Sequence, residues 1–343
     1  MNDVKPVVVL SGINKSFPEF SSLSSWIKGL GKPQPRRAVL NNIDLNVRRG
    51  DVFAFLGSNG AGKTTLLKMI ATLLLPDGGA IEVAGVDALR DPMEVKRRIG
   101  LCTSEERSFY WRLTARANLE FFGTLSGVPR RVLAKRIEDV AATVDMTSAL
   151  DWRMSWFSTG MRQRLAVARA MLADPEVLIF DEPTRAVDPV HAEEIRRLLR
   201  DRLAGELGKT VILSTNILEE AWAICDDVAI LANGSIVAHG SPDSLGDRFT
   251  QRRRYAIVLD RMEPKFIERL RGLTGVNSLE VTSVDPEAHL TLDLEHHDRN
   301  LTGVFAALGS NGVAVRAFRQ LDEEPFEVFR SATRTEGAEA ARG

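Results

Sequence analysis

Short apolar runs alternate with helical patterns through roughly residue 245. The runs at 51–57, 177–182 and 210–215 are almost wholly apolar and end in glycine, acidic or hydroxyl residues. Strands of this kind are buried on both faces, as in a parallel or mixed α/β sheet. Between about 106 and 165 the pattern becomes helical. We therefore expect an α/β fold with a helical subdomain inserted between two halves of the core.

A second, smaller unit is predicted after a polar and basic stretch at 246–254. Its alternating and helical patterns give the order β-α-β-β-α-β, which predicts a small α+β domain of the ferredoxin-like kind. We place the first domain at 1–250, the second at 251–335 and a disordered tail at 336–343. The expected elements of the second domain are strand 255–259, helix 266–273, strands 276–282 and 289–294, helix 301–308 and strand 313–318.

The composition narrows the class of protein. The chain has 343 residues, 44% of them hydrophobic, which is enough for two domains with real cores. Forty-five basic and 46 acidic residues leave a net charge of −1, so we expect no nucleic-acid partner. Cys102 and Cys225 suit a reducing compartment and are expected to be small buried residues. No signal peptide is recognisable, and no run approaches the roughly 18 uninterrupted apolar residues of a spanning helix.

The sequence GSNGAGKTT at 57–65 follows one predicted strand and opens a helix. Its glycines let backbone N–H groups turn inward to cradle phosphates at the helix N-terminus. Lys63 can reach the β- and γ-phosphates, and the Thr64 hydroxyl can ligate Mg²⁺. Alone, this loop predicts nucleotide binding and nothing narrower. The expected contacts are Gly57, Ser58, Asn59, Gly60, Ala61, Gly62, Lys63, Thr64 and Thr65.

An acidic pair, Asp181 and Glu182, ends the predicted strand at 177–182. Asp181 is placed to hold Mg²⁺ through water, and Glu182 is the candidate general base for an attacking water. Such a pair at a strand end is often only solvated. Its position downstream of the phosphate loop in the same sheet favours the catalytic interpretation.

The stretch FSTGMRQRLAVARAMLADP at 157–175 resembles the signature of ABC transporter ATPases, LSGGQ followed by a basic helix. Ser158 and Gly160 match that signature, whereas Thr159 and Met161 depart from it. The physical principle is again phosphate at a helix N-terminus, with Ser158 near the cap. In this family the signature contacts the nucleotide held by the other protomer, so the resemblance implies a dimer.

Other segments extend the resemblance over roughly 6–245. RAVDP at 185–189 resembles the family's D-loop, with Asp188 at the matching position. Phe17 sits where the family places an aromatic residue that stacks on adenine, although a buried core phenylalanine is the alternative. The resemblance implies a P-loop NTPase core of the ABC type that binds ATP and Mg²⁺. The ending EEPFEVFR at 323–330 is similar to the accessory C-terminal domain of the branch that exports drugs, polysaccharides or lipids.

Two further positions depart from the family's pattern. The Q-loop glutamine is absent, and Ser104 and Glu105 occupy its region. Glu105 could ligate metal or position water, or it could be a solvated acidic turn. Asn216 stands where the family has its switch histidine, and none of the five histidines can replace it locally. The expected catalytic residues are therefore Glu182, Asn216 and Glu105.

The resemblance implies an ATPase that dimerises around two Mg-ATP, with a second identical subunit expected, and drives a separate membrane-spanning permease from the cytoplasmic face of the membrane. One alternative is a non-transport ATPase of this family that acts on ribosomes or nucleic acid. Another is a slow nucleotide-sensing regulator, consistent with Asn216 and the missing glutamine. The aromatic and basic segment 18–40 is an apparent hairpin insertion, either solvated or placed against a membrane partner.

Overall fold

The computed structural model describes residues 5–18, 36–103, 109–185, 187–249, 252–260, 264–273, 275–283, 288–295 and 297–321. The chain divides into two compact units, Met1–Pro242 and Asp243–Gly343. The expected tail at 336–343 and most of the 18–40 segment lie outside the described residues.

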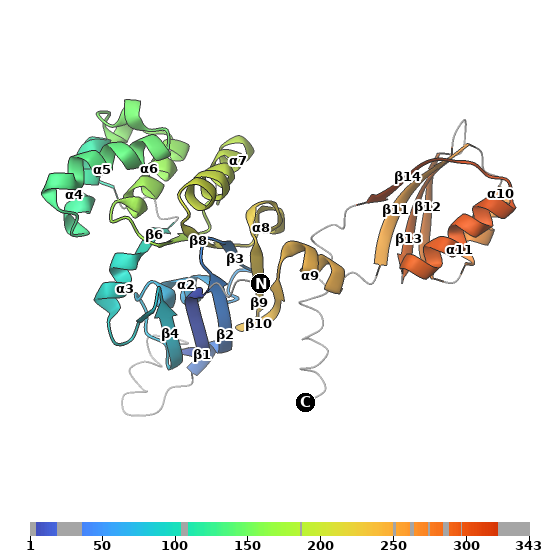
Figure 1. Cartoon of the computed structure of the whole chain (residues 1–343), viewed down its shortest axis with the longest axis horizontal. Helices are drawn as coiled ribbons and strands as arrows, with labels where there is room; N and C mark the ends of the chain where they lie inside the picture. The colour runs from blue at the N-terminus through green and yellow to red at the C-terminus, as the bar shows by residue number, and fades with distance from the viewer. Residues whose placement is uncertain are drawn as a thin grey trace, which may run out of the picture. The chain divides into compact units, whose positions relative to one another are not determined.

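A six-stranded sheet forms the centre of the first unit (Figure 1). Its strands are β3 (Val52–Gly57), β6 (Ile99–Thr103), β7 (Val177–Asp181), β8 (Thr210–Thr215), β9 (Asp227–Ala232) and β10 (Ser235–Gly240). The strand order is β10-β9-β3-β8-β7-β6, and neighbouring strands are parallel except β9 and β10. Every residue of β3 and β8 is buried, because parallel strands are covered on both faces. The expected α/β core and its three apolar strands are confirmed.

A second, antiparallel sheet belongs to the same unit. Its strands are β1 (Pro6–Pro18), β2 (Arg36–Arg48), β4 (Gly78–Val83) and β5 (Val86–Asp87). They lie in the order β2-β1-β4-β5. Buried residues recur along β1 and β2 between exposed ones, as in a sheet that has one face against the core.

The seven α-helices described in the first unit are α2 (Lys63–Ile70), α3 (Pro92–Arg98), α4 (Ala115–Leu125), α5 (Arg130–Thr143), α6 (Thr159–Met171), α7 (Pro189–Arg197) and α8 (Leu218–Ile224), with short 3₁₀ turns η2 (Thr147–Ala149) and η3 (Met154–Trp156) and a π-helical stretch η4 (Leu198–Glu206). Four of the seven, α3, α4, α6 and α7, begin at a residue whose side chain caps them. The side chains of Thr114 and Ser158 accept the N–H groups of Ala117 and Met161, which caps α4 and α6. Helices α4, α5 and α6 pack together as a helical subdomain (Figure 1), and α6 lies within the segment 157–175 that is expected to hold the signature and its basic helix.

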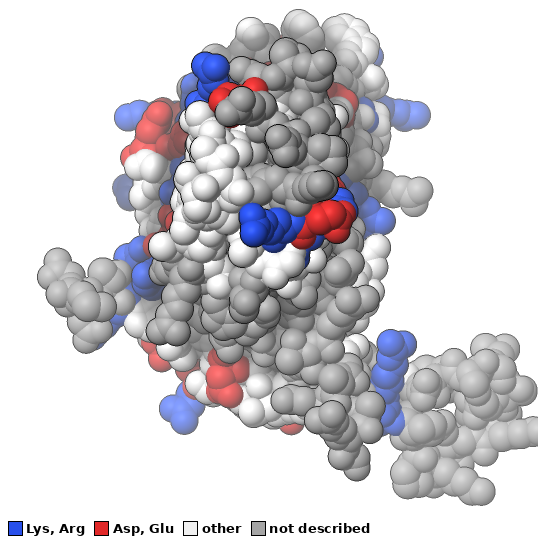
Figure 2. Space-filling view, turned by 90° about the vertical axis from the view of Figure 1, so that its right-hand side faces the viewer, with Lys and Arg blue, Asp and Glu red and all other residues white. Residues whose placement is uncertain are grey.

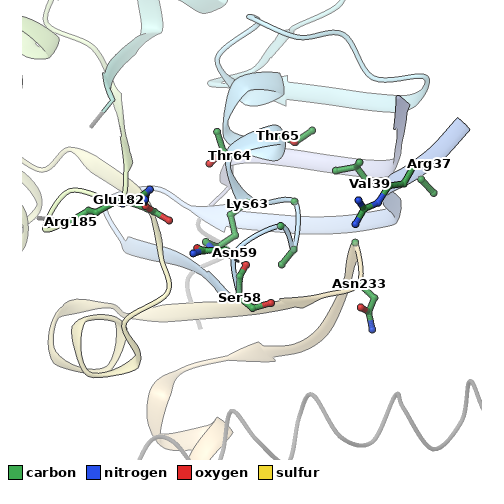
Figure 3. Close-up of a pocket in the computed structure, with 15 residues that line it drawn as sticks. Arg37, Val39, Ser58, Asn59, Lys63, Thr64, Thr65, Glu182, Arg185 and Asn233 are labelled. Atoms are coloured by element: carbon green, nitrogen blue, oxygen red, sulfur yellow. Dashed lines mark hydrogen bonds and ion pairs between the residues drawn. The ribbon is translucent and has the colours of Figure 1, made fainter. Parts of the chain in front are cut away.

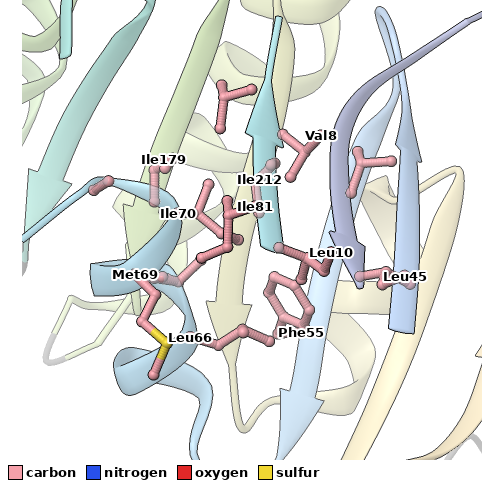
Figure 4. Close-up of a cluster of buried hydrophobic side chains, with 14 of the residues drawn as sticks. Val8, Leu10, Leu45, Phe55, Leu66, Met69, Ile70, Ile81, Ile179 and Ile212 are labelled. Atoms are coloured by element: carbon pink, nitrogen blue, oxygen red, sulfur yellow. The ribbon is translucent and has the colours of Figure 1, made fainter. Parts of the chain in front are cut away.

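One apolar cluster joins both sheets of the first unit to α2 (Figure 4). Leu66, Met69 and Ile70 of α2 are at most 1% exposed and pack with residues such as Phe55 of β3 and Ile81 of β4. Replacing such a leucine by alanine costs about 2–5 kcal/mol, because the cavity that remains is only partly refilled. The helix that follows the glycine-rich loop is therefore held firmly between the two sheets.

The second unit is an antiparallel sheet with its own core. Its elements are α9 (Pro242–Phe249), β11 (Arg252–Leu259), α10 (Pro264–Arg271), β12 (Val276–Ser283), β13 (Ala288–Glu295), α11 (His297–Ser310) and β14 (Val315–Leu321). The strand order is β12-β13-β11-β14, with all neighbours antiparallel. Leu290, Leu292 and Leu294 are at most 1% exposed and share a cluster with Val304 and Leu308 of α11. The alternation predicted for β13 is confirmed.

Both cysteines are free and buried in the first unit, as expected. Burial raises the pKa of the Cys102 thiol to about 11, so this side chain stays protonated and inert near neutral pH. Among the described residues, no helix combines the length and apolar character that a membrane crossing requires.

The separate cores predict that the first unit folds without the second. A fragment ending at residue 250 is expected to unfold cooperatively, within about 5 °C of the corresponding transition of the full chain, because its apolar cluster contains no residue of the second unit. Scanning calorimetry of the fragment and the full chain is the measurement. An insoluble fragment, or one that lacks a cooperative transition, would show that the second unit completes the first one's core.

Candidate active site

The glycine-rich loop connects β3 to α2. Gly60 and Gly62 adopt φ values of 87° and 108°, which residues other than glycine rarely adopt. A Cβ on Gly62 would also lie 2.6 Å from Leu40 Cδ2. This conformation brings the loop round to the N-terminus of α2, where free N–H groups favour an anion. The expected phosphate loop has the geometry that its sequence requires.

Lys63, the first residue of α2, is 5% exposed. Its Nζ donates to the carbonyl oxygens of Gly57 at 2.7 Å and Ser58 at 3.1 Å. Burial lowers the pKa of this ammonium, whereas the nearby carboxylates of Glu182 and Asp181 act to raise it. A buried cation is therefore held on the loop by carbonyl dipoles and two acidic neighbours.

The acidic pair at the end of β7 faces this loop. The Asp181 carboxylate accepts a hydrogen bond from the Thr64 hydroxyl at 3.0 Å and another from the Ser214 hydroxyl at 2.6 Å, both on Oδ1. These contacts arise because β8 lies between β3 and β7, so the carboxyl ends of all three strands meet at one edge. Parallel topology thus brings together polar groups that are far apart in the sequence.

Glu182 follows β7 with φ at 52°, an unusual value for a residue with a side chain. Such a conformation costs on the order of 1–3 kcal/mol and persists only where the surroundings hold it. Here the backbone N–H of Glu182 donates to both the carbonyl and the hydroxyl of Ser214, each at 3.1 Å. The Glu182 carboxylate, 13% exposed, accepts a hydrogen bond from Arg185 at 2.7 Å.

A cavity of about 800 Å³ opens over the phosphate loop. Figure 3 shows Glu182 and Arg185 on one side of Lys63, and Arg37 and Asn233 on the other. This volume is in the range of small-molecule sites. Its lining consists of Arg37, Ala38, Val39, Ser58, Asn59, Gly60, Ala61, Gly62, Lys63, Thr64, Thr65, Glu182, Arg185, Asn233 and Gly234.

The signature segment lies at the start of α6. Ser158 is the N-cap, and its hydroxyl accepts the N–H of Met161 at 3.2 Å. Asp188 is the N-cap of α7. Neither these residues nor Thr159 and Gly160 line the cavity of the same chain.

Two of the remaining predicted site residues, Asn216 and Phe17, lie outside the set that lines the cavity. Asn216 directly follows β8 and is exposed. Phe17, on β1, is 37% exposed, with Lys15 Nζ 5.5 Å from its ring centroid. It is therefore not a buried core residue. Glu105 lies outside the described residues.

Sequence reasoning missed four polar side chains of this site. Ser214 bonds Asp181 and the Glu182 backbone, and Arg185 pairs with Glu182. Arg37 lies opposite Phe17 in the β1–β2 register and lines the cavity, as does Asn233 from the β9–β10 turn. Ser214 could have been found from its place beside Asn216, at the end of the strand next to β7. The other three carry no signal in the local sequence.

Comparison with known proteins shows which family the chain belongs to. A family model described as "ABC transporter" matches residues 40–185. The ABC transporter ATP-binding protein NatA of Bacillus subtilis (strain 168) is 40% identical over 211 residues, or 60% of this chain and 83% of that protein. The daunorubicin resistance ATP-binding protein DrrA2 of Streptomyces coeruleorubidus is 35% identical over 317 residues, or 91% of this chain and 96% of that protein.

Solved structures agree. The structure of cbiO1 from Clostridium perfringens, part of the ABC transporter complex cbiONQ, superposes with a TM-score of 0.60. It is 25% identical and covers 70% of this chain and 90% of its own. The expected resemblance is confirmed: the chain belongs to the ABC transporter family, as an ATP-binding ATPase subunit related to those of drug exporters.

Proposed function

We propose that this chain binds Mg-ATP on its phosphate loop and hydrolyses it as a dimer, to drive export through a separate membrane-spanning permease. The observation that carries the proposal is the meeting of Lys63, Thr64, Asp181 and Glu182 at the carboxyl ends of β3 and β7, under one cavity. A buried cation, a hydroxyl, a carboxylate and a candidate base are the groups that phosphoryl transfer requires.

The donor set fits Mg²⁺. Thr64 and Asp181 offer hard oxygen atoms 3.0 Å apart. In the described part of the chain, no group of three or more His, Cys, Asp or Glu residues could hold a metal by itself. An ion shared between one or two protein oxygens and the substrate phosphates matches this set. Once bound, Mg²⁺ would neutralise negative charge that develops on the phosphates.

Each protein group then has a distinct task. The loop N–H groups and Lys63 would hold the β- and γ-phosphates, and the Glu182 carboxylate would accept the proton of the attacking water. Arg185 donates to Oε2 of this carboxylate, and because it is 67% exposed it can turn into solvent at little cost and leave both oxygens to the water. Asn216, at the end of the strand between the two motifs, would donate one neutral hydrogen bond toward the terminal phosphate.

A dimer would complete the site. The residues Ser158, Thr159, Gly160 and Met161 start a helix outside the cavity, and Asp188 lies outside it as well. If two identical chains pair head to tail, the signature of one protomer meets the nucleotide of the other. Each ATP would then bridge the pair and bind the closed state preferentially, which couples binding to motion.

Export through a permease follows from the relatives. The drug-resistance ATP-binding proteins among them match this chain over most of its length. We place the chain at the cytoplasmic face of the membrane, against a permease that supplies the spanning helices. The expected substrate is of the kind that the export branch moves, a drug, a polysaccharide or a lipid.

The second unit would be an accessory domain with ferredoxin-like topology. Both β11 and β12 are antiparallel to β13, which lies between them, so β11 and β12 are parallel to each other. With α10 as their connection, they form a split βαβ unit, and α11 with β14 completes the arrangement.

The second candidate, a slow nucleotide-sensing regulator, is favoured by the asparagine at position 216 and by the missing Q-loop glutamine. Action on ribosomes or nucleic acid has less support. The net charge is −1, and among the described residues visible in Figure 2 basic and acidic side chains are interspersed. A nucleic-acid surface would show a basic patch.

Lys63→Ala is expected to weaken Mg-ATP binding at least tenfold, because it removes the fixed charge that faces the phosphates. Lys68→Ala is the matched control, since Lys68 lies on the same helix but is exposed. Isothermal titration with Mg-ATP measures both variants. Equal affinities for the two variants would contradict the assignment of Lys63.

Glu182→Gln should retain nucleotide binding but lower hydrolysis by at least about a hundredfold, because the amide cannot accept the water's proton. Mg-ATP should then accumulate a dimer, which size exclusion detects. Glu219→Gln, an exposed change on α8, serves as the control. A Glu182→Gln variant that hydrolyses ATP like the unmodified chain would exclude Glu182 as the base.

Asn216→His is expected to raise turnover about ten- to a hundredfold while ATP affinity changes little. A charge-assisted hydrogen bond to phosphate is about twice as strong as a neutral one. The difference, on the order of 1–3 kcal/mol at the transition state, corresponds to about ten- to a hundredfold in rate. The measurement is steady-state ATPase at saturating Mg-ATP, compared with exposed Asn41→His. A histidine variant no faster than the native chain would mean that Asn216 belongs to a differently adapted site.

A further inference from the structure

His191 lies between two segments that the mechanism places at the dimer interface. It is the third residue of α7 and lies three positions after the cap residue Asp188. One carboxylate oxygen of Asp188 accepts the backbone N–H groups of Val190 at 3.1 Å and His191 at 3.2 Å, and this satisfies the cap. The second oxygen is 2.6 Å from His191 Nδ1. The ring contact is therefore additional to helix capping.

The chemistry of this pair assigns the proton. The backbone N–H and the ring of His191 hold the pKa of Asp188 below its ordinary value, so Asp188 is a carboxylate near neutral pH. A carboxylate can only accept, and Nδ1 must therefore donate. The Nε2 edge of the ring then faces away from Asp188.

That other edge lies against the signature. A Cβ built on Gly160 would be 2.8 Å from His191 Cδ2 and 3.4 Å from Nε2. Gly160 is buried in the first turn of α6, two residues after the cap Ser158. The imidazole thus fills the space that a side chain at 160 would need, which gives this glycine a packing reason within its own chain.

We propose that His191 is a positioning residue that holds the signature segment, residues 158–161, in register with Asp188, so that both meet the partner protomer as one unit. The inference rests on the proposed function, in which both elements face the nucleotide of the other protomer. Folding itself depends little on the contact, because the His191 and Asp188 side chains are 45% and 56% exposed.

The test uses dimer formation in the Glu182→Gln background. Adding His191→Ala is expected to raise the Mg-ATP-dependent dimer dissociation constant about tenfold, measured by analytical ultracentrifugation. Adding His191→Asn should restore most of this loss, since its amide can donate to Asp188 from a similar position. Binding of Mg-ADP to the single chain and the melting temperature should stay unchanged in both.

His239→Ala is the matched control, because His239 pairs with Asp227 at 3.1 Å and is similarly exposed, but contacts neither the signature nor Asp188. This control should dimerise normally. Dimerisation of the His191→Ala protein at the control's level would overturn the role of His191 alone. A parallel loss of Mg-ADP affinity or melting temperature, or no recovery with asparagine, would also overturn it. If Glu182→Gln itself stays monomeric with Mg-ATP, the dimer mechanism fails and the inference falls with it.

Discussion

The hydrogen bond from the Thr64 hydroxyl to the Asp181 carboxylate joins segments 117 residues apart. The bond depends on β3 and β7 being parallel with one strand between them, because this places their carboxyl ends near each other at the same edge of the sheet. Strand β8 is the one between them, and its Ser214 hydroxyl donates to the same carboxylate oxygen. The apolar cluster around α2 keeps Thr64 at this edge. The architecture of the first unit can thus be understood as support for one polar contact.

Local chemistry explains how much of this could be predicted. Strands β3, β7 and β8 were recognisable because burial on both faces demands apolar runs. The loop and the cap of α6 were recognisable because glycine and serine are typical of those positions, whereas Asp188 was singled out by family resemblance and not as the cap of α7. The order of elements in the second unit followed from alternation alone.

The remaining features depend on contacts between distant segments. No local rule places Ser214 against both members of the acidic pair, because that contact requires the strand order. Nor does one predict the left-handed backbone of Glu182, which is held by β8. The pairing of His191 with Asp188 could be suspected from their spacing, but the close approach of its ring to Gly160 could not.

Charge balance explains how so many acidic groups coexist near the loop. Asp181 is stabilised by two hydroxyl donors and Glu182 by a guanidinium, and both favour the charged form of buried Lys63. A third carboxyl, Glu220 on α8, is fully buried and accepts the Thr184 hydroxyl at 2.8 Å. Burial is the main cause that raises the pKa of Glu220, because a surrounding with little water disfavours the charged form of a carboxyl group.

The same contact has a mechanical consequence. Thr184 lies two residues after Glu182, and Glu220 lies four residues after Asn216. Because their bond is buried, separating them would leave polar groups without water or partner, which costs about 1–3 kcal/mol. The segments after β7 and β8 should therefore move together.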